Sequence, residues 1–192
     1  MSRLISHELR YRVLDLIIVV AMAPLWIPIF GLLICALFLA QGSPVFFCCK
    51  RVGPHGTFSM YKFRSMIRNA PLRETSEALN DYVTPIGRVI RRSSVDELPQ
   101  LINVVMGSMS LVGPRPSLPS QSDLIEARKQ RGLDLYSPGL TGLAQVRGRD
   151  FLSMMKKVRY EQFYANKRSV ALYFWVVGLT VKTVFSGRGV KY

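Results

Sequence analysis

The stretch LIIVVAMAPLWIPIFGLLICALFLAQ, residues 16–41, runs without one charged residue. An apolar run of this length predicts a membrane segment. It is too long for the apolar part of a cleaved signal peptide, and the GSPVFF that follows is typical of the start of a strand. The sequence therefore predicts an anchor over residues 1–41 and a separate domain over residues 42–192.

Two prolines inside the segment, Pro24 and Pro28, argue against a straight crossing, because each removes a backbone donor and bends a helix. Both flanks are basic, with Arg3, Arg10 and Arg12 before the segment and Lys50, Arg51, Lys62 and Arg64 after it. The positive-inside tendency draws both ends to the cytoplasmic face. We expect a re-entrant hairpin, with a single kinked span as the alternative. Asp15 is expected to pair with the neighbouring Arg12 at the interface.

The chain has 26 basic and 12 acidic residues, for a formal net charge of +14. This excess predicts an anionic partner, which is nucleic acid, an anionic membrane surface or a phosphorylated substrate. The three cysteines, Cys35, Cys48 and Cys49, have no Cys-x-x-Cys spacing. Neither a disulfide framework nor a zinc site is indicated, and a reducing environment fits best.

Beyond the anchor the pattern predicts an α+β fold. Strand-like runs at 44–52 and 57–66, joined by a Gly-Pro turn, indicate a β-hairpin. Residues 84–116 have helical periodicity in two pieces, and 118–132 reads as an amphipathic helix. Residues 169–185 are apolar and aromatic but too short to cross a bilayer, which favours an interfacial helix. A buried core helix is the alternative there.

The stretch RRSSVDELPQL, residues 91–101, contains adjacent carboxylates, Asp96 and Glu97, in this basic chain. Ser94 and Glu97 match a capping box at a helix start. However, Pro99 suits the first position of a helix rather than its interior. In that second register the two carboxylates lie just ahead of the helix, where backbone donors favour phosphate.

Carboxylates among arginines suit phosphoryl transfer, because phosphate repels an anionic nucleophile until cations neutralise it. Asp96 as nucleophile and Glu97 as metal or proton partner form a coherent pair, although their order does not assign the roles. Mg²⁺ takes one or two carboxylates plus substrate phosphates, so both acids are candidate ligands.

Candidate phosphate-binding cations lie in three further segments. Lys62 and Arg64 alternate around Phe63 and share one strand face, with a solvated face as the alternative. Arg115 lies between two prolines, which hold it on a stiff backbone and favour a preorganised guanidinium, with a plain turn as the alternative. In SPGLTGLAQVRGR, residues 137–149, the glycines allow a ligand to approach closely and two arginines are placed to clamp a diphosphate. A basic surface loop is the alternative there, and it is favoured for Arg147.

Four segments in this order, GSPVFF…RVGPHG, YKFRSM, SSVDELPQLINV…GSMSLVGPRP and PGLTGLAQVRGR, resemble the bacterial sugar transferases, or monotopic phosphoglycosyl transferases, over nearly the whole chain. The resemblance implies a re-entrant anchor and a catalytic domain on the cytoplasmic face of the bacterial inner membrane. It implies transfer of a sugar 1-phosphate from a UDP-sugar to polyprenol (undecaprenyl) phosphate, with UMP released and a covalent aspartyl intermediate. By this resemblance Asp96 is the nucleophile and Glu97 its partner at Mg²⁺. The substrate-binding candidates are Lys62, Arg64, Arg92, Arg115, Pro116 and Arg149.

Three positions depart from the family pattern: Cys49 replaces a glutamine, Ser137 an arginine, and Tyr173 a carboxylate of the C-terminal helix. A different class of function, a non-catalytic basic module that binds anionic lipid or nucleic acid, remains the alternative. Asp96 and Glu97 would weaken the positive electrostatic potential by which such a module attracts its anionic partner. Aromatic residues are not interleaved with the basic ones, so no nucleic acid is expected. The sequence does not specify the sugar or the pathway, and it leaves a homo-oligomer open.

Overall fold

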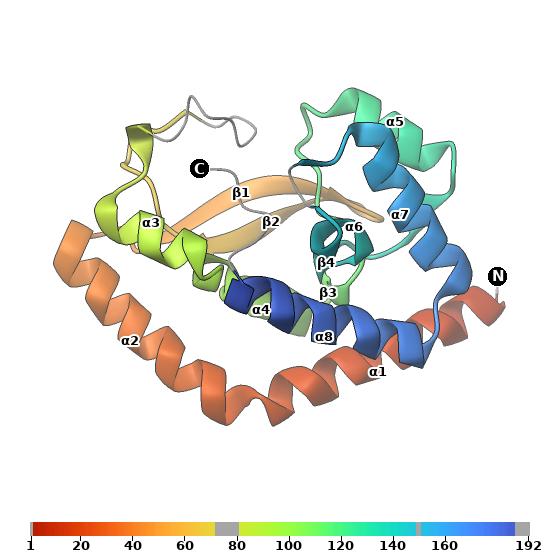
Figure 1. Cartoon of the computed structure of the whole chain (residues 1–192), viewed down its shortest axis with the longest axis horizontal. Helices are drawn as coiled ribbons and strands as arrows, with labels where there is room; N and C mark the ends of the chain where they lie inside the picture. The colour runs from red at the N-terminus through yellow and green to blue at the C-terminus, as the bar shows by residue number, and fades with distance from the viewer. Residues whose placement is uncertain (1, 72–80, 149–150, 187–192) are drawn as a thin grey trace.

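The computed structural model describes residues 2–71, 81–148 and 151–186. Its first two helices, α1 (Ser2–Ala21) and α2 (Ala23–Gln41), meet at a wide angle at Met22 (Figure 1). Pro24 lies in the first turn of α2, where its missing N–H is tolerated. Pro28 lies inside α2, which continues past it. The indole Nε1 of Trp26 donates to the Val19 carbonyl across the break, at 3.0 Å.

The predicted β-hairpin is confirmed. Strand β1 (Phe46–Gly53) pairs antiparallel with β2 (Gly56–Phe63), with Phe46 opposite Phe63 and Gly53 opposite Gly56. The second strand ends three residues earlier than predicted, so Arg64 lies just beyond it.

The remaining elements are mostly short helices. In chain order they are α3 (Pro85–Arg92), the 3₁₀ turn η2 (Val95–Glu97), α4 (Gln100–Met106), β3 (Ser110–Val112), α5 (Ser122–Lys129), the 3₁₀ turn η3 (Leu133–Leu135), β4 (Gly139–Thr141), α6 (Leu143–Val146), α7 (Met154–Lys167) and α8 (Val170–Ser186). The helices expected in 84–116 and 118–132 are present. The short strands β3 and β4 and the helix α7 were not anticipated.

Strands β3 and β4 form a short parallel pair in the core. Their backbones approach so closely that a Cβ at Gly139 would lie 2.1 Å from the Gly113 amide nitrogen. A Cβ at Gly142 would lie 2.2 Å from the Gly113 carbonyl oxygen. The glycines of segment 137–149 therefore allow two strands to meet, which differs from the ligand approach that the sequence suggested.

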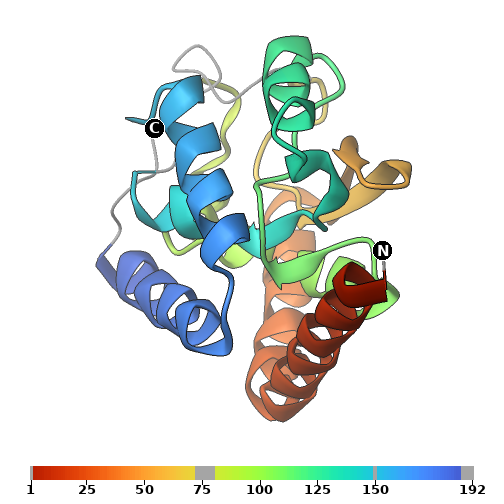
Figure 2. The ribbon, with the colours of Figure 1, turned by 90° about the vertical axis from the view of Figure 1, so that its right-hand side faces the viewer.

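The helices α1, α2 and α8 each bury one face in the protein and expose apolar side chains on another face. In α1, Tyr11 and Val19 are buried while Val13 and Ile17 are exposed. In α2 the buried Leu37 belongs to a core cluster with Phe63 and Ile90, and in α8 Tyr173 and Val176 join the main core. The exposed apolar side chains of α2 and α8 are Leu25, Ile27, Ile29, Leu32, Phe38, Leu39, Val170, Phe174, Trp175 and Val181. Figure 2 shows the α1–α2 pair and α8 apart from each other on the lower side of the molecule.

Within the described ranges, α2 is the one helix long and apolar enough to cross a membrane, and α8 is a shorter apolar helix. Together with the exposed apolar faces of all three helices, this indicates membrane association. Because α8 also packs Tyr173 and Val176 into the core, it combines features of the interfacial helix and of the core helix that the sequence left open.

Asp15 connects the anchor to the core. Its carboxylate accepts from the Ser110 hydroxyl at 2.7 Å, the Leu111 amide at 3.1 Å and the Tyr173 hydroxyl at 2.6 Å. The expected pair with Arg12 is therefore wrong, because Arg12 donates instead to carbonyls at the end of α4. Burial, reinforced by the hydrogen bond to Asp15, raises the pKa of Tyr173 above its usual value.

Candidate active site

The two adjacent carboxylates lie in the 3₁₀ turn η2, immediately before α4. Ser94 adopts the left-handed conformation, with φ of 56°, and its side chain does not cap the turn. The capping-box interpretation is therefore wrong. Pro99 is the N-cap of α4, one position before the one expected, and the carboxylates precede the helix as the second register predicted.

Both carboxylates are buried, with 7% of Asp96 and 8% of Glu97 exposed. Glu97 Oε1 accepts from Lys62 Nζ at 2.9 Å and from an Arg115 guanidinium nitrogen at 3.4 Å. A buried carboxylate needs such partners, because removing it from water without compensation costs roughly several kcal/mol. Strand β2 supplies Lys62, and the Pro-Arg-Pro turn after β3 supplies Arg115.

Asp96 lines a cavity of 340 Å³ beside the β-hairpin, which we call the cationic cavity. Five basic side chains share its walls, namely Arg51, Lys62, Arg64, Arg68 and Arg91. Phe46, Phe47 and Phe63 provide apolar walls.

Arg64 is held by backbone oxygens at the end of α2. It donates to the Gln41 and Gly42 carbonyls at 2.7 and 2.9 Å, and only 7% of the residue is exposed. Its Nε and its other terminal nitrogen are buried without a hydrogen-bond partner, as is Nε of Arg51. Burial lowers the pKa of Arg64, and Arg68 lowers it further. Buried donors without partners are costly, so these guanidinium groups favour an anionic ligand in the cationic cavity.

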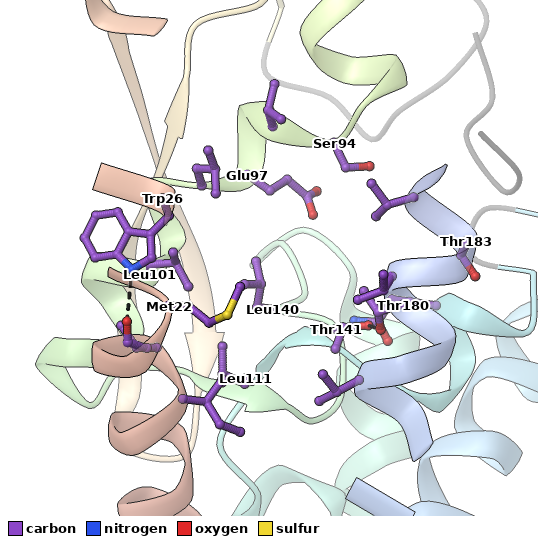
Figure 3. Close-up of a pocket in the computed structure, with 18 of the residues that line it drawn as sticks. Met22, Trp26, Ser94, Glu97, Leu101, Leu111, Leu140, Thr141, Thr180 and Thr183 are labelled. Carbon is purple, nitrogen blue, oxygen red and sulfur yellow. Dashed lines mark hydrogen bonds between the residues drawn. The ribbon is translucent and has the colours of Figure 1, made fainter. Parts of the chain in front are cut away.

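Glu97 lines a second cavity, of 420 Å³, which we call the apolar cavity. Figure 3 shows Glu97 and Ser94 at one end of it, with Trp26, Leu101 and Leu111 among its walls. The side chains lining it come mainly from the α1–α2 break, from η2 with its flanking residues, and from α8. Its cations are Arg92 and Arg115.

The other residues that the sequence singled out lie in different parts of the structure. Lys62 of β2 and Arg64, just beyond that strand, share the cationic cavity, and Arg92 and Arg115 line the apolar cavity. The Pro116 carbonyl accepts from Arg51 at 3.4 Å. Arg149 lies outside the described residues. Arg147, 5.2 Å above the Trp175 ring, makes a cation–π contact with α8, and Tyr173 lies in the core.

Three basic residues and one amide of the two cavities were missed from sequence: Arg51, Arg68, Arg91 and Gln145. A signal for Arg91 was present, because successive helix residues point about 100° apart. Arg91 and Arg92 therefore face different cavities. Gln145 carried no comparable signal, since its significance depends on burial.

The adjacent carboxylates of Asp96 and Glu97 suggest a place for a divalent cation. Neither here nor at any other place in the described ranges do three or more His, Cys, Asp or Glu side chains lie together. Two carboxylates are the small set of protein ligands that Mg²⁺ completes with substrate phosphates and water. The residues present are therefore compatible with that metal.

Comparison with known proteins identifies the family. Residues 6–187 match the model of the bacterial sugar transferases, and the chain belongs to that family. It is 40% identical to the uncharacterized sugar transferase EpsL of Bacillus subtilis, over 80% of this chain and 76% of that protein. It is 34% identical to the exopolysaccharide production protein ExoY of Sinorhizobium fredii, over 88% and 81% of the two chains.

A third relative has a more specific name. The UDP-glucose:undecaprenyl-phosphate glucose-1-phosphate transferase of Caulobacter vibrioides is 40% identical over 75% of this chain. The match covers 56% of that longer protein.

Proposed function

We propose that this protein transfers a sugar 1-phosphate from a UDP-sugar to polyprenol phosphate and releases UMP. The observation that carries the proposal is the position of Asp96 and Glu97, between a cationic cavity and an apolar one. The cationic cavity suits a nucleotide diphosphosugar and the apolar cavity suits a lipid. The names of relatives, including the undecaprenyl-phosphate transferase of C. vibrioides, support the same two substrates. The reaction would begin the membrane stage of glycoconjugate assembly, such as exopolysaccharide or capsule synthesis.

The reaction follows a covalent route. A carboxylate oxygen of Asp96 attacks the phosphorus that carries the sugar, and the bond from that phosphorus to UMP breaks. A phosphate oxygen of polyprenol phosphate then attacks the same phosphorus and releases Asp96. The product is a polyprenyl diphosphate sugar. Only one anionic substrate is handled in each step, so Lys62 and the arginines serve both.

Glu97 orients the cations that neutralise the phosphoryl group, since its Oε1 contacts both Lys62 and Arg115. Mg²⁺, when bound by Asp96 and Glu97, would withdraw charge from the phosphate oxygens. Arg64 and Arg51 present buried N–H groups to the diphosphate of the UDP-sugar. Charge-assisted hydrogen bonds of this kind are about twice as strong as neutral ones.

The anchor, residues 1–41, enters and leaves the membrane on the cytoplasmic side, and residues 42–192 form the catalytic domain there. Contacts at both ends of the helix pair support this topology. Glu8 pairs with Arg168 near the start of α1, and Gln41 Nε2 donates to the Arg64 carbonyl at 2.6 Å at the end of α2. A single span would separate these ends by a hydrocarbon core of about 30 Å. Tags at either terminus should both be reached from the cytoplasm, whereas an N-terminal tag labelled only from outside would establish a span.

The activity is tested with purified protein, Mg²⁺, polyprenol phosphate and a panel of UDP-sugars. We expect UMP release with at least one sugar, and none from Asp96→Asn, because an amide is no substitute nucleophile. Thermal unfolding shows whether the variant is folded. If no donor releases UMP while the protein still binds anionic vesicles, the non-catalytic membrane module becomes the better account.

A further inference from the structure

Gln145 is a buried amide without a partner in the wall of the apolar cavity. Only 8% of the residue is exposed, and neither Nε2 nor Oε1 has a hydrogen-bond partner. Burying an unpaired amide costs about 1–3 kcal/mol on mutational scales, so this side chain is poorly explained by packing alone. Such a group indicates a polar ligand that is bound during function.

Other polar side chains of the same wall are satisfied. Thr180 donates to the Val176 carbonyl at 2.7 Å, and the Thr141 hydroxyl lies 2.7 Å from the Thr180 hydroxyl. Among the described buried side-chain atoms that lack a partner, those lining this cavity belong to Gln145. The amide also has reserved space, because a Cβ at Gly142 would lie 2.5 Å from its Oε1.

The walls around Gln145 are suited to a lipid. Met22 and Leu25 at the α1–α2 break and Val181 of α8 line the cavity, and all three are exposed as well. The cavity is thus continuous with the apolar surface that indicates membrane association. A UDP-sugar is polar and water-soluble, and it would leave these walls without apolar contacts, whereas each buried methylene of a lipid contributes about 0.8 kcal/mol.

The polar groups of the cavity suit a phosphate head. Arg92 and Arg115 supply positive charge, and Glu97 lines the same cavity. A phosphate monoester has a second pKa of about 6, so it offers acceptor oxygens and, in its monoanion, one hydroxyl donor. A carboxamide with both its donor and its acceptor available matches that group.

From these observations we propose that the apolar cavity receives the polyprenol phosphate acceptor from the membrane, and that Gln145 binds its phosphate and determines affinity for it. This rests on the proposed transferase function and deepens it, because it assigns the two substrates to opposite sides of Asp96 and Glu97. The donor occupies the cationic cavity, and the acceptor reaches the same phosphorus from the other side.

The experiment measures the two half-reactions separately in Gln145→Met, which keeps the length of the side chain and removes its polar atoms. Exchange of labelled UMP into the UDP-sugar, without acceptor, reports donor chemistry. Transfer at varied polyprenol phosphate reports the KM for the acceptor. We expect the KM for the acceptor to rise about tenfold or more, as for a lost hydrogen bond to a charged group. The rate of UMP exchange should change by less than about threefold, which is within the range of indirect effects.

Two further variants keep the test decisive. Gln130→Met makes the same change at the exposed C-cap of α5 and should behave as wild type. Val181→Trp narrows the cavity from its exposed side and should also raise the acceptor KM, even if Gln145→Met does not fold.

Unchanged acceptor KM in the folded variants would overturn the inference and indicate that the cavity holds ordinary phospholipid. Equal losses of exchange and transfer would also overturn it, because Gln145 would then serve the donor. A wild-type protein with neither exchange nor transfer would overturn the proposed function itself, and this inference with it.

Discussion

The cationic and the apolar cavity lie on either side of two adjacent carboxylates, yet their walls have opposite chemistry. Five basic side chains line the cavity of Asp96, and aliphatic residues of three apolar helices dominate the cavity of Glu97. A 3₁₀ turn has three residues per turn, so neighbouring side chains in η2 point about 120° apart. Two consecutive acids can therefore serve two compartments, which explains why the chain keeps a carboxylate pair in this position.

Among the substitutions that keep the nucleophile, the largest effect is expected from Glu97→Gln, because Glu97 contacts cations that reach it from both sides. Loss of its charge frees Lys62 and Arg115 from their common partner. Turnover should fall by about 10²-fold or more, as is typical when an acid–base or metal partner is lost, in exchange and in transfer alike. A loss confined to one half-reaction would show that Glu97 serves one cavity only.

A crossed pair of substitutions would separate the cavities. Arg64→Met should raise the KM for the UDP-sugar about tenfold or more, as expected for a lost charge-assisted bond, with less effect on the KM for the acceptor. Arg92→Met should show the reverse pattern. Arg88→Met, at an exposed position of α3 outside the two cavity walls, is the matched control. The same KM pattern in both variants would mean that the cavities do not divide the substrates.

Tyr173→Phe tests the core contact between α8 and α1 without altering the walls of the two cavities. Losing the hydrogen bond to the Asp15 carboxylate should lower the free energy of unfolding by about 1.5–3 kcal/mol, with both KM values unchanged. Because the folded pKa of Tyr173 is raised, its contribution is fully present below about pH 10, the unfolded value, and is lost above it. Thermal unfolding against pH should therefore decline less steeply above pH 10 in the variant. An identical decline would show that Tyr173 titrates normally.

The smallest effect is expected at the anchor. Pro24→Leu restores a backbone donor beside the break at Met22, so α1 and α2 should straighten and move Met22 and Trp26 away from the apolar cavity. Because this shift removes apolar contacts from the cavity wall, the KM for the acceptor should rise roughly a few-fold. Pro28→Leu, inside a helix that already continues past it, should change less. Equal effects of the two substitutions on KM, or on labelling of an N-terminal tag, would show that other contacts hold the bend.

Local patterns predicted the local elements of this fold. Alternation and a Gly-Pro turn were sufficient for the β1–β2 hairpin, and periodicity located α3, α4 and α5. The β3–β4 pair was not predictable in this way, because each strand has only three residues, nearly all of them buried, and the two strands are far apart in the sequence. The predicted Asp15–Arg12 pair was wrong for a related reason. Arg12 lies on the adjacent helical turn, but residues of β3 and α8, distant in the sequence, are the hydrogen-bond partners of Asp15 in the fold.

The site shows the same division. The carboxylate pair and the basic residues Lys62, Arg64, Arg92 and Arg115 were identifiable by their chemistry. Lys62 and Arg64 line one cavity, although Arg64 lies beyond the strand that was expected to hold both. The separation of the site residues between two cavities depends on side-chain direction in η2 and α3, which residue type does not encode. Gln145 could be recognised only once its burial and lack of partners were known.

The central claim is that Asp96 carries the sugar phosphate from one cavity to the other. The most direct measurement incubates the protein with a UDP-sugar labelled on the sugar-linked phosphate, without acceptor, and maps the label by mass spectrometry. We predict that the label resides on the peptide containing Asp96, that polyprenol phosphate discharges it, and that Asp96→Asn retains none. Full turnover with no labelled peptide, together with kinetics that require both substrates bound at once, would contradict the account.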